Sequence, residues 1–387
     1  MSFAIYIHWP FCKSKCPYCD FNSHVSEIID YKRWRDSYLI SIENWAKQTN
    51  GRIVDTVFFG GGTPSLMPAD LVGDILSSIQ NHWRVSNDWE VTLEANPTSF
   101  EIEKFEAFHA AGVNRVSLGV QSLYEEDLKF LGRGHSPDQA RFALSEAQKI
   151  FDRTSFDLIY ARPKQTVEMW TRELEEALSL SRGHLSLYQL TIEKGTPFFT
   201  RHARKEFVIP EQDLAADLYD VTQDILEKAG MPAYEVSNHA VAGQESCHNL
   251  IYWRYGEYLG IGPGAHGRVI LNGQRFSTRD HRAPEIWLDR VEQTGNGLQA
   301  QELLALDAQF QECLMMGMRL KEGVPFSRLE PFCNEGVFSM LDSKAFDHLV
   351  SGGIMEDVSS MQEKTLRTTP QGFKCLNAVL GYLLARP

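Results

Sequence analysis

IYIHWPFCKSKCPYCDF (residues 5–21) places three cysteines in one short loop that directly follows an apolar strand. Cys12, Cys16 and Cys19 are spaced as C-x3-C-x2-C. Three thiolates so close in the chain can bind three irons of a cubane cluster and leave one iron without a protein ligand. An open iron can bind a small molecule, so this spacing indicates chemistry at a 4Fe–4S cluster rather than a buried electron carrier.

A zinc site is the alternative for this loop. Structural zinc usually takes four protein ligands, often in two paired knuckles, and the chain has no second C-x2-C pair. His8 or His24 would have to complete such a site. The other cysteines are scattered singly through the chain: Cys247, Cys313, Cys333 and Cys375. An odd total without a framework predicts a reducing compartment rather than a disulfide-stapled secreted protein.

The N-terminal residues and the composition predict a cytoplasmic protein. The stretch MSFAIYIHWP lacks the charged region and long apolar core of a signal peptide, and the Arg- and Ser-rich character of a transit peptide. The chain has no run of about 18 apolar residues that would predict a membrane span. The net charge of −13 and the lack of a Lys/Arg run argue against nucleic-acid binding.

Short β-branched runs alternate with helical patterns through the first two-thirds of the chain, which predicts an α/β fold. The predicted strands are residues 3–9, 55–61, 90–96, 115–121, 154–160 and 184–190. The predicted helices are residues 31–45, 69–83, 101–111, 137–151, 167–180 and 211–229. Near-continuous apolar strands are typical of a parallel sheet buried on both faces. Six strand–helix units with right-handed crossovers predict a doubly wound sheet or an incomplete barrel.

Polar and glycine-rich residues follow several predicted strands at their C-terminal ends, where α/β folds collect functional groups. They are residues 60–64, Glu94, Asn96, Gln121, Ser122 and Asp157. The segment GGGTP (60–64) offers backbone groups that a ligand can approach closely, because glycine has no side chain. A flexible turn is the alternative. Phosphate binding is the weaker hypothesis, because the chain has neither the phosphate-loop pattern nor the dinucleotide-binding pattern.

The motifs together resemble those of the radical S-adenosylmethionine enzymes. The chain combines the cysteine loop, with Tyr18 before its last cysteine, with FFGGGTPS (58–65), LEANP (93–97), SLGVQS (117–122) and FLGRGH (130–135). This set is most similar to the branch that contains oxygen-independent coproporphyrinogen III oxidase and the heme chaperone HemW family. The resemblance spans essentially the whole chain. It implies an α/β fold with an incomplete (β/α)6 TIM-like barrel, closed by a small C-terminal α+β winged-helix-like domain.

The resemblance also implies a cofactor site, in which Cys12, Cys16 and Cys19 bind a 4Fe–4S cluster and its open iron binds S-adenosylmethionine. The residues that match cofactor-binding positions of the family are Tyr6, Tyr18, Gly61, Gly62, Thr63, Glu94, Gln121, Arg133 and Asp157. The last three match positions that bind a second cofactor molecule in the decarboxylating relative. A surface cation at Arg133 and a loop cap at Asp157 are the alternatives.

Two features distinguish the members of this branch. The decarboxylating oxidase has a further cysteine two residues after the third cluster cysteine, where this chain has Phe21. The second feature is an H-N-x-x-Y-W motif that resembles the HemW signature and consists of His248, Asn249, Tyr252 and Trp253. A histidine can ligate heme iron, and aromatic rings can pack on a flat macrocycle. The alternative is a loop whose two aromatic rings only fill the open side of the barrel.

Cys247, which precedes this motif, is either an adjacent heme ligand or a small buried thiol. The fifth-strand motif FDLIYARP (156–163) departs from the family, because Ala161 and Arg162 replace a glycine and an apolar residue. Arg162 would pair with a carboxylate of a cofactor or porphyrin, or point to solvent. This departure puts the backbone geometry near Asp157 in doubt.

Three regions are expected along the chain: a radical S-adenosylmethionine partial barrel over residues 1–236, an extension with the H-N-x-x-Y-W motif over 237–300, and a helical, winged-helix-like domain over 301–387. Asn272-Gly273 predicts a hairpin in the extension. The group Met315, Met316 and Met318 is interpreted as core packing rather than a heme site.

The hypothesis from the sequence is a heme chaperone that binds heme, a 4Fe–4S cluster and S-adenosylmethionine, and transfers heme to hemoproteins, respiratory ones among them. Recipients that are membrane-bound imply transient contact with membrane proteins, and a homodimer is a further expectation. No catalytic residue is assigned. The alternative is a radical enzyme that oxidatively decarboxylates the propionates of coproporphyrinogen III. Phe21 and the His248 motif favour the chaperone, whereas the cluster and glycine motifs are common to both.

Overall fold

The computed structural model describes residues 2–385 and is built around one curved, mixed sheet. Six of its strands are parallel and lie side by side in chain order: β1 (Phe3–Trp9), β4 (Ile53–Gly61), β5 (Arg84–Ala95), β6 (Arg115–Gln121), β7 (Arg153–Tyr160) and β8 (His184–Gln189). The α/β prediction is therefore confirmed, and all six predicted strands are present.

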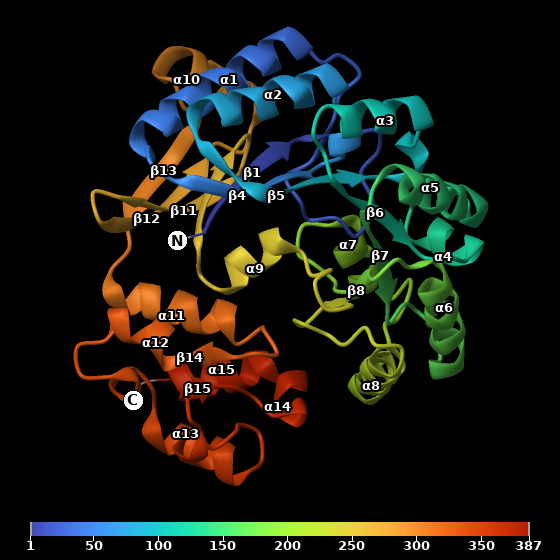
Figure 1. Cartoon of the computed structure of the whole chain (residues 1–387). Helices are drawn as coiled ribbons and strands as arrows, with labels where there is room; N and C mark the ends of the chain where they lie inside the picture. Colours follow the sequence, from blue (N-terminus) through green and yellow to red (C-terminus); the bar gives the residue numbers. More distant parts are fainter. Residues whose placement is uncertain (1, 386–387) are drawn as a thin grey trace.

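Helices cover the outer face of this sheet (Figure 1). The helices that follow the parallel strands are α1 (Tyr31–Gln48), α2 (Ala69–His82), α3 (Ile102–Ala110), α4 (Glu125–Phe130), α5 (Pro137–Ile150), α6 (Val167–Leu180), α7 (Pro197–Ala203) and α8 (Gln212–Lys228); of these, α7 lies by the cysteine loop, where the Phe198 N–H donates to the Pro17 oxygen over 2.9 Å. Their starts follow local chemistry, because Asp30 caps α1 and Ser136 forms a capping box with Gln139 at α5. The strands between the helices and the lumen are largely buried, which explains their apolar sequences.

A seventh parallel strand was not predicted. β10 (Glu257–Ile261) pairs with the free edge of β1, so that Phe3 lies opposite Glu257. Its sequence, EYLGI, is short and contains a glycine, which gives a weak strand signal. The reason for Gly260 is steric, because a Cβ there would lie 2.2 Å from the backbone oxygen of His266. Pairing between chain segments so far apart leaves no local pattern to detect.

Antiparallel strands extend the sheet at both edges: β9 (Asn238–Ala240) next to β8, and β11 (His266–Leu271), β12 (Gln274–Asp280) and β13 (Leu298–Leu303) beyond β10. The predicted hairpin is confirmed between β11 and β12. Asn272 and Gly273 both have positive φ, 51° and 78°, as a tight turn between twisted strands requires. α10 (Pro284–Thr294) then packs against α1.

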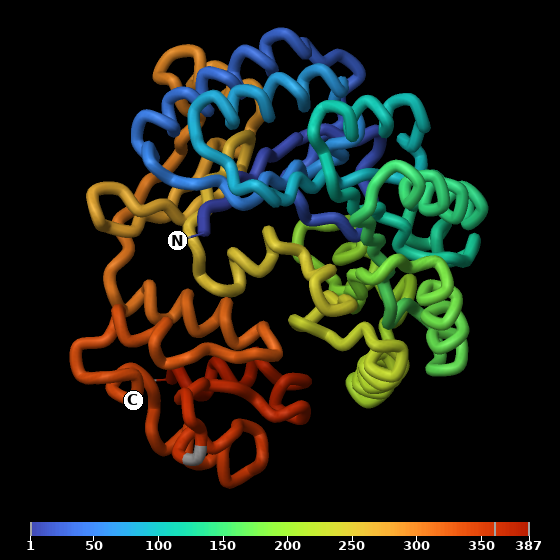
Figure 2. The backbone as a smooth tube through the Cα atoms, in the orientation of Figure 1, coloured from blue at the N-terminus to red at the C-terminus, as the bar shows by residue number. Residues whose placement is uncertain are grey.

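The C-terminal residues form a second lobe with its own core, orange to red in Figure 2. Its elements are α11 (Leu306–Gly317), β14 (Val324–Pro325), α12 (Phe326–Leu329), α13 (Ser343–Ser351), β15 (Thr365–Leu366), α14 (Pro370–Lys374) and α15 (Leu376–Leu384). Met318 is buried in this core, whereas Met315 is exposed, so only part of the methionine group packs as expected. No helix within residues 2–385 is long and apolar enough to cross a membrane.

Two features of this architecture position the candidate site. The cysteine loop leaves β1 through the short strand β2 (Phe11–Cys12), which pairs with β3 (His24–Val25) at the C-terminal rim of the parallel strands. The helix α9 (Cys247–Trp253) lies on the inner, concave side of the sheet, against β4 and β1 (Figure 1). The predicted cysteine loop therefore lies at the rim of the parallel strands, whereas the predicted H-N-x-x-Y-W motif lies on the concave face of the sheet.

Candidate functional site

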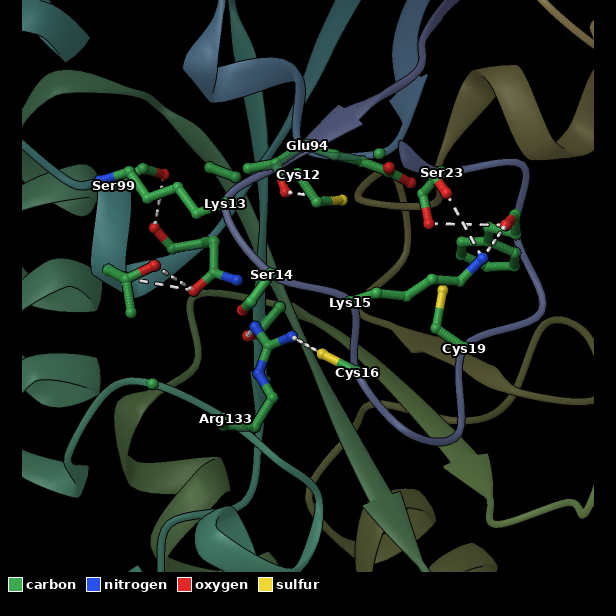
Figure 3. Close-up of a pocket in the computed structure, with 18 of the residues that line it drawn as sticks. Cys12, Lys13, Ser14, Lys15, Cys16, Cys19, Ser23, Glu94, Ser99 and Arg133 are labelled. Carbon is green, nitrogen blue, oxygen red and sulfur yellow. Dashed lines mark hydrogen bonds between the residues drawn. The ribbon is translucent and has the colours of Figure 1, made fainter. Parts of the chain in front are cut away.

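A pocket of about 350 Å³ opens at the C-terminal rim of the parallel strands, as the strand-end rule predicts. The predicted site residues that line it are Cys12, Cys16, Tyr18, Cys19, Gly61, Gly62, Thr63, Glu94, Gln121, Arg133 and Asp157. These residues come from the cysteine loop, from the segment between α4 and α5 that carries Arg133, and from β4, β5, β6 and β7 or the turns after them, so the fold gathers residues that are far apart in the sequence. Figure 3 shows the three cysteines, Glu94 and Arg133 around this space.

The three thiols of the loop are half-buried and reduced, and two of them accept hydrogen bonds. Thr63 donates from Oγ1 to Cys12 Sγ over 3.4 Å, and Arg133 donates from Nη1 to Cys16 Sγ over 3.3 Å. Burial raises the pKa of the Cys12 and Cys19 thiols. Three thiols that face one pocket, beside donors that can stabilise thiolate sulfur, are a donor set suited to an iron–sulfur cluster.

The glycine triplet has a packing role that the sequence interpretation missed. A Cβ on Gly60 would lie 2.8 Å from the Tyr6 ring, one on Gly61 would lie 2.5 Å from the His8 ring, and one on Gly62 would lie 2.6 Å from the Phe11 oxygen. The glycines therefore let β4 approach β1 and the start of the cysteine loop. Gly60 and Gly61 end β4 and Gly62 follows it, so close packing is a reason for glycine at all three positions.

The FLGRGH segment also packs against the cysteine loop, on the side away from β4. Gly132 has φ 68°, and a Cβ there would lie 2.6 Å from the Pro17 ring. The Arg133 side chain is largely buried and donates from Nη2 to the Gly119 oxygen over 2.7 Å. Arg133 therefore joins Cys16 to the end of β6, and it is not the surface cation that was the alternative.

Burial raises the pKa of two carboxyl groups in the pocket, Glu94 and Asp157. Burial, reinforced by repulsion from Asp157, raises the pKa of Glu94 to about 8. Burial raises the pKa of Asp157 to about 6, although hydrogen bonds from Ser186 and Ser117 oppose the shift. Glu94 Oε2 also accepts the Gly61 N–H over 3.3 Å. At neutral pH this pair carries about one negative charge, which a cationic ligand in the pocket would stabilise.

The two histidines considered for zinc lie beside the loop. His8 Nε2 contacts the Asn22 oxygen at 2.9 Å and its Nδ1 contacts the Tyr6 hydroxyl at 3.1 Å, so both ring nitrogens already have partners. Tyr6, predicted to lie against the cofactor, is thus in the layer beneath the pocket lining. Within residues 2–385, no group of three or more His, Cys, Asp or Glu side chains is arranged to hold a single metal ion.

The H-N-x-x-Y-W motif forms α9 and lies outside the pocket lining. His248 is only 1% exposed and stacks on Phe58 with ring centroids 4.9 Å apart. Its Nδ1 contacts Thr56 Oγ1 at 2.8 Å, and its Nε2 contacts the Tyr252 hydroxyl at 2.7 Å. Burial lowers the pKa of His248 to about 3, so the ring is neutral. Thr56, which contacts His248, and Gly61, which lines the pocket, are about 16 Å apart along β4 at ~3.3 Å per residue. His248 therefore lies well away from the pocket.

The other motif residues are less buried than His248. Tyr252 and Trp253 are partly exposed, and the Arg319 guanidinium lies 4.8 Å from the Trp253 ring centroid. Asn249 is also partly exposed. Cys247 is exposed, which corrects the expectation of a buried thiol.

Arg162 has neither of the roles predicted for it. It is 1% exposed and pairs with the buried Glu173 carboxylate on α6, through Nη1 to Oε1 at 3.2 Å and through Nη2 to Oε2. Its Nη2 also lies 3.2 Å from Asp127. Glu173 in turn accepts the Ser122 hydroxyl at 2.6 Å. The FDLIYARP departure is therefore an internal ion pair behind the sheet that supports the turn after β6.

Comparison with known proteins agrees with this geometry. Residues 6–177 match the model of the radical SAM superfamily. The chain is 38% identical to the bovine protein named radical S-adenosyl methionine domain-containing protein 1, mitochondrial, over 99% of this chain and 87% of the relative. It is 36% identical to heme chaperone HemW of Escherichia coli, over 99% of this chain and 98% of the relative. The chain belongs to the HemW family of the radical SAM superfamily.

A solved structure supports the fold of this HemW family member. Escherichia coli coproporphyrinogen III oxidase, HemN, described as a radical SAM enzyme, has a TM-score of 0.82 and 21% identity, covering 99% of this chain and 90% of that chain. At that identity the likeness shows the fold alone. The family itself implies a 4Fe–4S cluster and S-adenosylmethionine, and the three thiols and the pocket fit them. When bound, the cluster supplies an open iron and one-electron chemistry.

Several pocket residues were not predicted: Lys13, Ser14, Lys15, Thr98, Ser99, Ser117 and Gly119. A signal existed for two of them, because Ser117 and Gly119 precede Gln121 at intervals of two along β6. Alternate residues of a strand face the same side, so a polar residue on the side of Gln121 faces the lumen. Glu90 was also missed, although it alternates with Glu94 along β5 and contacts α9.

Proposed function

We propose that this protein is a heme chaperone that binds heme and transfers it to hemoproteins, respiratory ones among them, while a 4Fe–4S cluster and S-adenosylmethionine occupy the rim pocket. The observation that carries the proposal is the similarity to heme chaperone HemW over nearly the whole of both chains. A second relative of that name, from Haemophilus influenzae, is 34% identical over 98% of this chain and 97% of the relative. Phe21, in place of the extra cysteine of the oxidase, supports the same function.

Within this proposal, His248 is the heme ligand and Asn249, Tyr252 and Trp253 help to bind the macrocycle. A neutral imidazole is the form that ligates iron, and His248 is neutral. Its Nε2 contacts the Tyr252 hydroxyl, so ligation through this atom requires Tyr252 to move. Thr56 at Nδ1 would then orient the ring, as a hydrogen-bond partner at the second nitrogen commonly does for metal-binding histidines.

The remaining details belong to the same proposal. They are the three regions 1–236, 237–300 and 301–387, a winged-helix-like fold of the last, a cytoplasmic location, transient contact with membrane-bound recipients, no nucleic-acid partner and a homodimer. The separate core of the C-terminal lobe and its short β14–β15 pair support the third region. The relatives bear names of both bacterial and mitochondrial proteins.

One reconstituted sample tests the proposal. Heme binding is measured by its Soret absorption in the wild type, in His248→Ala and in a His202→Ala control, which removes a histidine from α7 outside the motif. We expect His248→Ala alone to weaken binding or shift the Soret band. The same reduced, anaerobic sample is then supplied with coproporphyrinogen III. Absent heme binding together with formation of protoporphyrinogen IX would reject the chaperone in favour of the oxidase.

A further inference from the structure

A buried carboxylate reaches the heme-motif helix from the sheet. Glu90 on β5 is 2% exposed, and its Oε1 accepts the backbone N–H of His248 over 3.0 Å. Its Oε2 accepts the backbone N–H of Cys247 over 3.2 Å. These amides begin α9, where backbone N–H groups have no partner within the helix. A charged acceptor at this point satisfies them more strongly than a neutral one.

Two arginines hold Glu90 in its ionised form and in this position. Arg153 Nη1 donates to Oε2 over 2.6 Å, and Arg115 Nε lies 4.0 Å from the same oxygen. Burial alone would raise the pKa of Glu90, but attraction from the two guanidinium groups and the hydrogen bonds from the His248 and Cys247 amides together outweigh it, so the pKa is lowered. Arg153 also donates to the Glu245 oxygen over 2.6 Å, just before α9. The carboxylate is therefore fixed on one side by charge and binds the helix on the other.

Arg115 also connects Glu90 to the rim pocket through a series of hydrogen bonds. Arg115 Nη2 donates to Ser155 Oγ over 2.9 Å, and Ser155 contacts Ser117 Oγ at 2.9 Å. Ser117 donates to Asp157 Oδ1 over 3.4 Å, and Asp157 lines the pocket. The base of the lumen is thus a connected set of polar side chains. Each member has a partner, which makes the arrangement rigid.

We propose that Glu90 is a positioning residue for the heme motif: it anchors α9 to the sheet and so sets the place and orientation of His248. This inference rests on the proposed function, because it assigns His248 as the group being positioned. Glu90 itself touches neither the pocket nor the ring nitrogens. Glu90 acts through the backbone amides of Cys247 and His248. A control variant can separate this role from the general stability that a buried ion pair contributes.

The chain offers a matched control. Glu257 on β10 is also buried, also accepts an arginine, from Arg52 Nε over 2.8 Å, and also accepts a backbone N–H, from Ile270 over 2.8 Å. The two glutamates differ in that the N–H that donates to Glu257 belongs to β11, whereas those that donate to Glu90 belong to α9. Glu257→Gln therefore removes the same kind of buried charge without removing a hydrogen bond to α9.

The test compares full-length Glu90→Gln, Glu90→Asp and Glu257→Gln with wild type. Amide hydrogen exchange is measured over residues 245–253, and the Soret spectrum of added heme is recorded. We expect both Glu90 variants to speed exchange in this segment by roughly ten- to hundredfold, the range for loss of a hydrogen bond to a charged group. They should also shift the heme spectrum, whereas Glu257→Gln should leave both unchanged. Glu90→Asp keeps the charge for the arginines and shortens the reach, so it covers the case in which Glu90→Gln does not fold.

The outcomes separate the two proposals. If wild type binds heme and the Glu90 variants keep its spectrum and exchange rates, the positioning role is overturned and the chaperone stands. If wild type binds no heme, the proposed function fails, and the exchange rates alone decide whether Glu90 anchors α9. Unchanged exchange in the Glu90 variants overturns the inference in either case.

Discussion

Ala161 should tolerate glycine far better than a buried alanine in regular structure. Its φ is 55°, in the left-handed region, which costs a non-glycine residue about 1–2 kcal/mol. Ala161→Gly removes this strain. Against it stand the loss of a buried methyl, about 0.8 kcal/mol, and the extra entropy of an unfolded glycine, about 0.5–1 kcal/mol. The net change in the free energy of unfolding should therefore be close to zero.

Ala143 provides the comparison, since it is fully buried in the middle of α5. Ala143→Gly loses a methyl of the same size and about 1 kcal/mol of helix propensity, with no strain to relieve, which adds to a loss of about 2 kcal/mol. Urea unfolding followed by far-UV circular dichroism measures both variants. Equal destabilisation at the two positions would falsify the idea that the Ala161 backbone is strained.

Three further results are expected. Gly62→Ala should reduce the iron and sulfide content of purified protein, because the new Cβ would lie 2.6 Å from the Phe11 oxygen. The control Gly381→Ala places its Cβ in open space and should keep the content of both elements. Equal content in the two variants would contradict the packing argument. Arg133→Gln should make the cluster more labile to oxygen by removing the cation that donates to a loop sulfur, so an unchanged decay of its absorbance would count against that role. The pKa of Glu94 is raised from 4.5 to about 8, so its folded form binds the proton more tightly and stability should fall as pH rises from about 5 to 8.5. The loss should be on the order of 2 kcal/mol, less than the full shift at about 1.4 kcal/mol per unit because water reaches the pocket, and Glu94→Gln should lack this slope in urea titrations.

Local patterns predicted most of the fold and the lining of the pocket. The parallel strands and their helices follow from apolar runs and helical periodicity, and the strand-end rule places Glu94 and Asp157 at one rim. The C-x3-C-x2-C spacing directly after the first strand placed the cysteines, and the motif resemblance agreed with it. β10 was missed because its pairing with β1 depends on a contact between distant segments and leaves no pattern within EYLGI.

Burial was the property that the sequence could not supply. The sequence around an arginine near a strand end is the same whether its side chain faces a ligand or a buried carboxylate. The sequence therefore did not predict that Arg162 pairs with Glu173. His248 shows the same limit, since its residue type suggests a ligand and only the packing shows Thr56 and Tyr252 at its two nitrogens.

The junction after α9 limits how the protein can be divided. Tyr255, two residues beyond Trp253, is buried in the core of the C-terminal lobe, where its hydroxyl donates to Glu312 over 2.8 Å. Arg254 pairs with Glu322 of the same lobe at 2.8 Å. A shortened protein that stops near residue 300 would leave Tyr255 in water and α9 tethered from one side only. Loss of heme binding in such a fragment would therefore not by itself show that the missing lobe supplies a ligand, because α9 would also have lost its anchor.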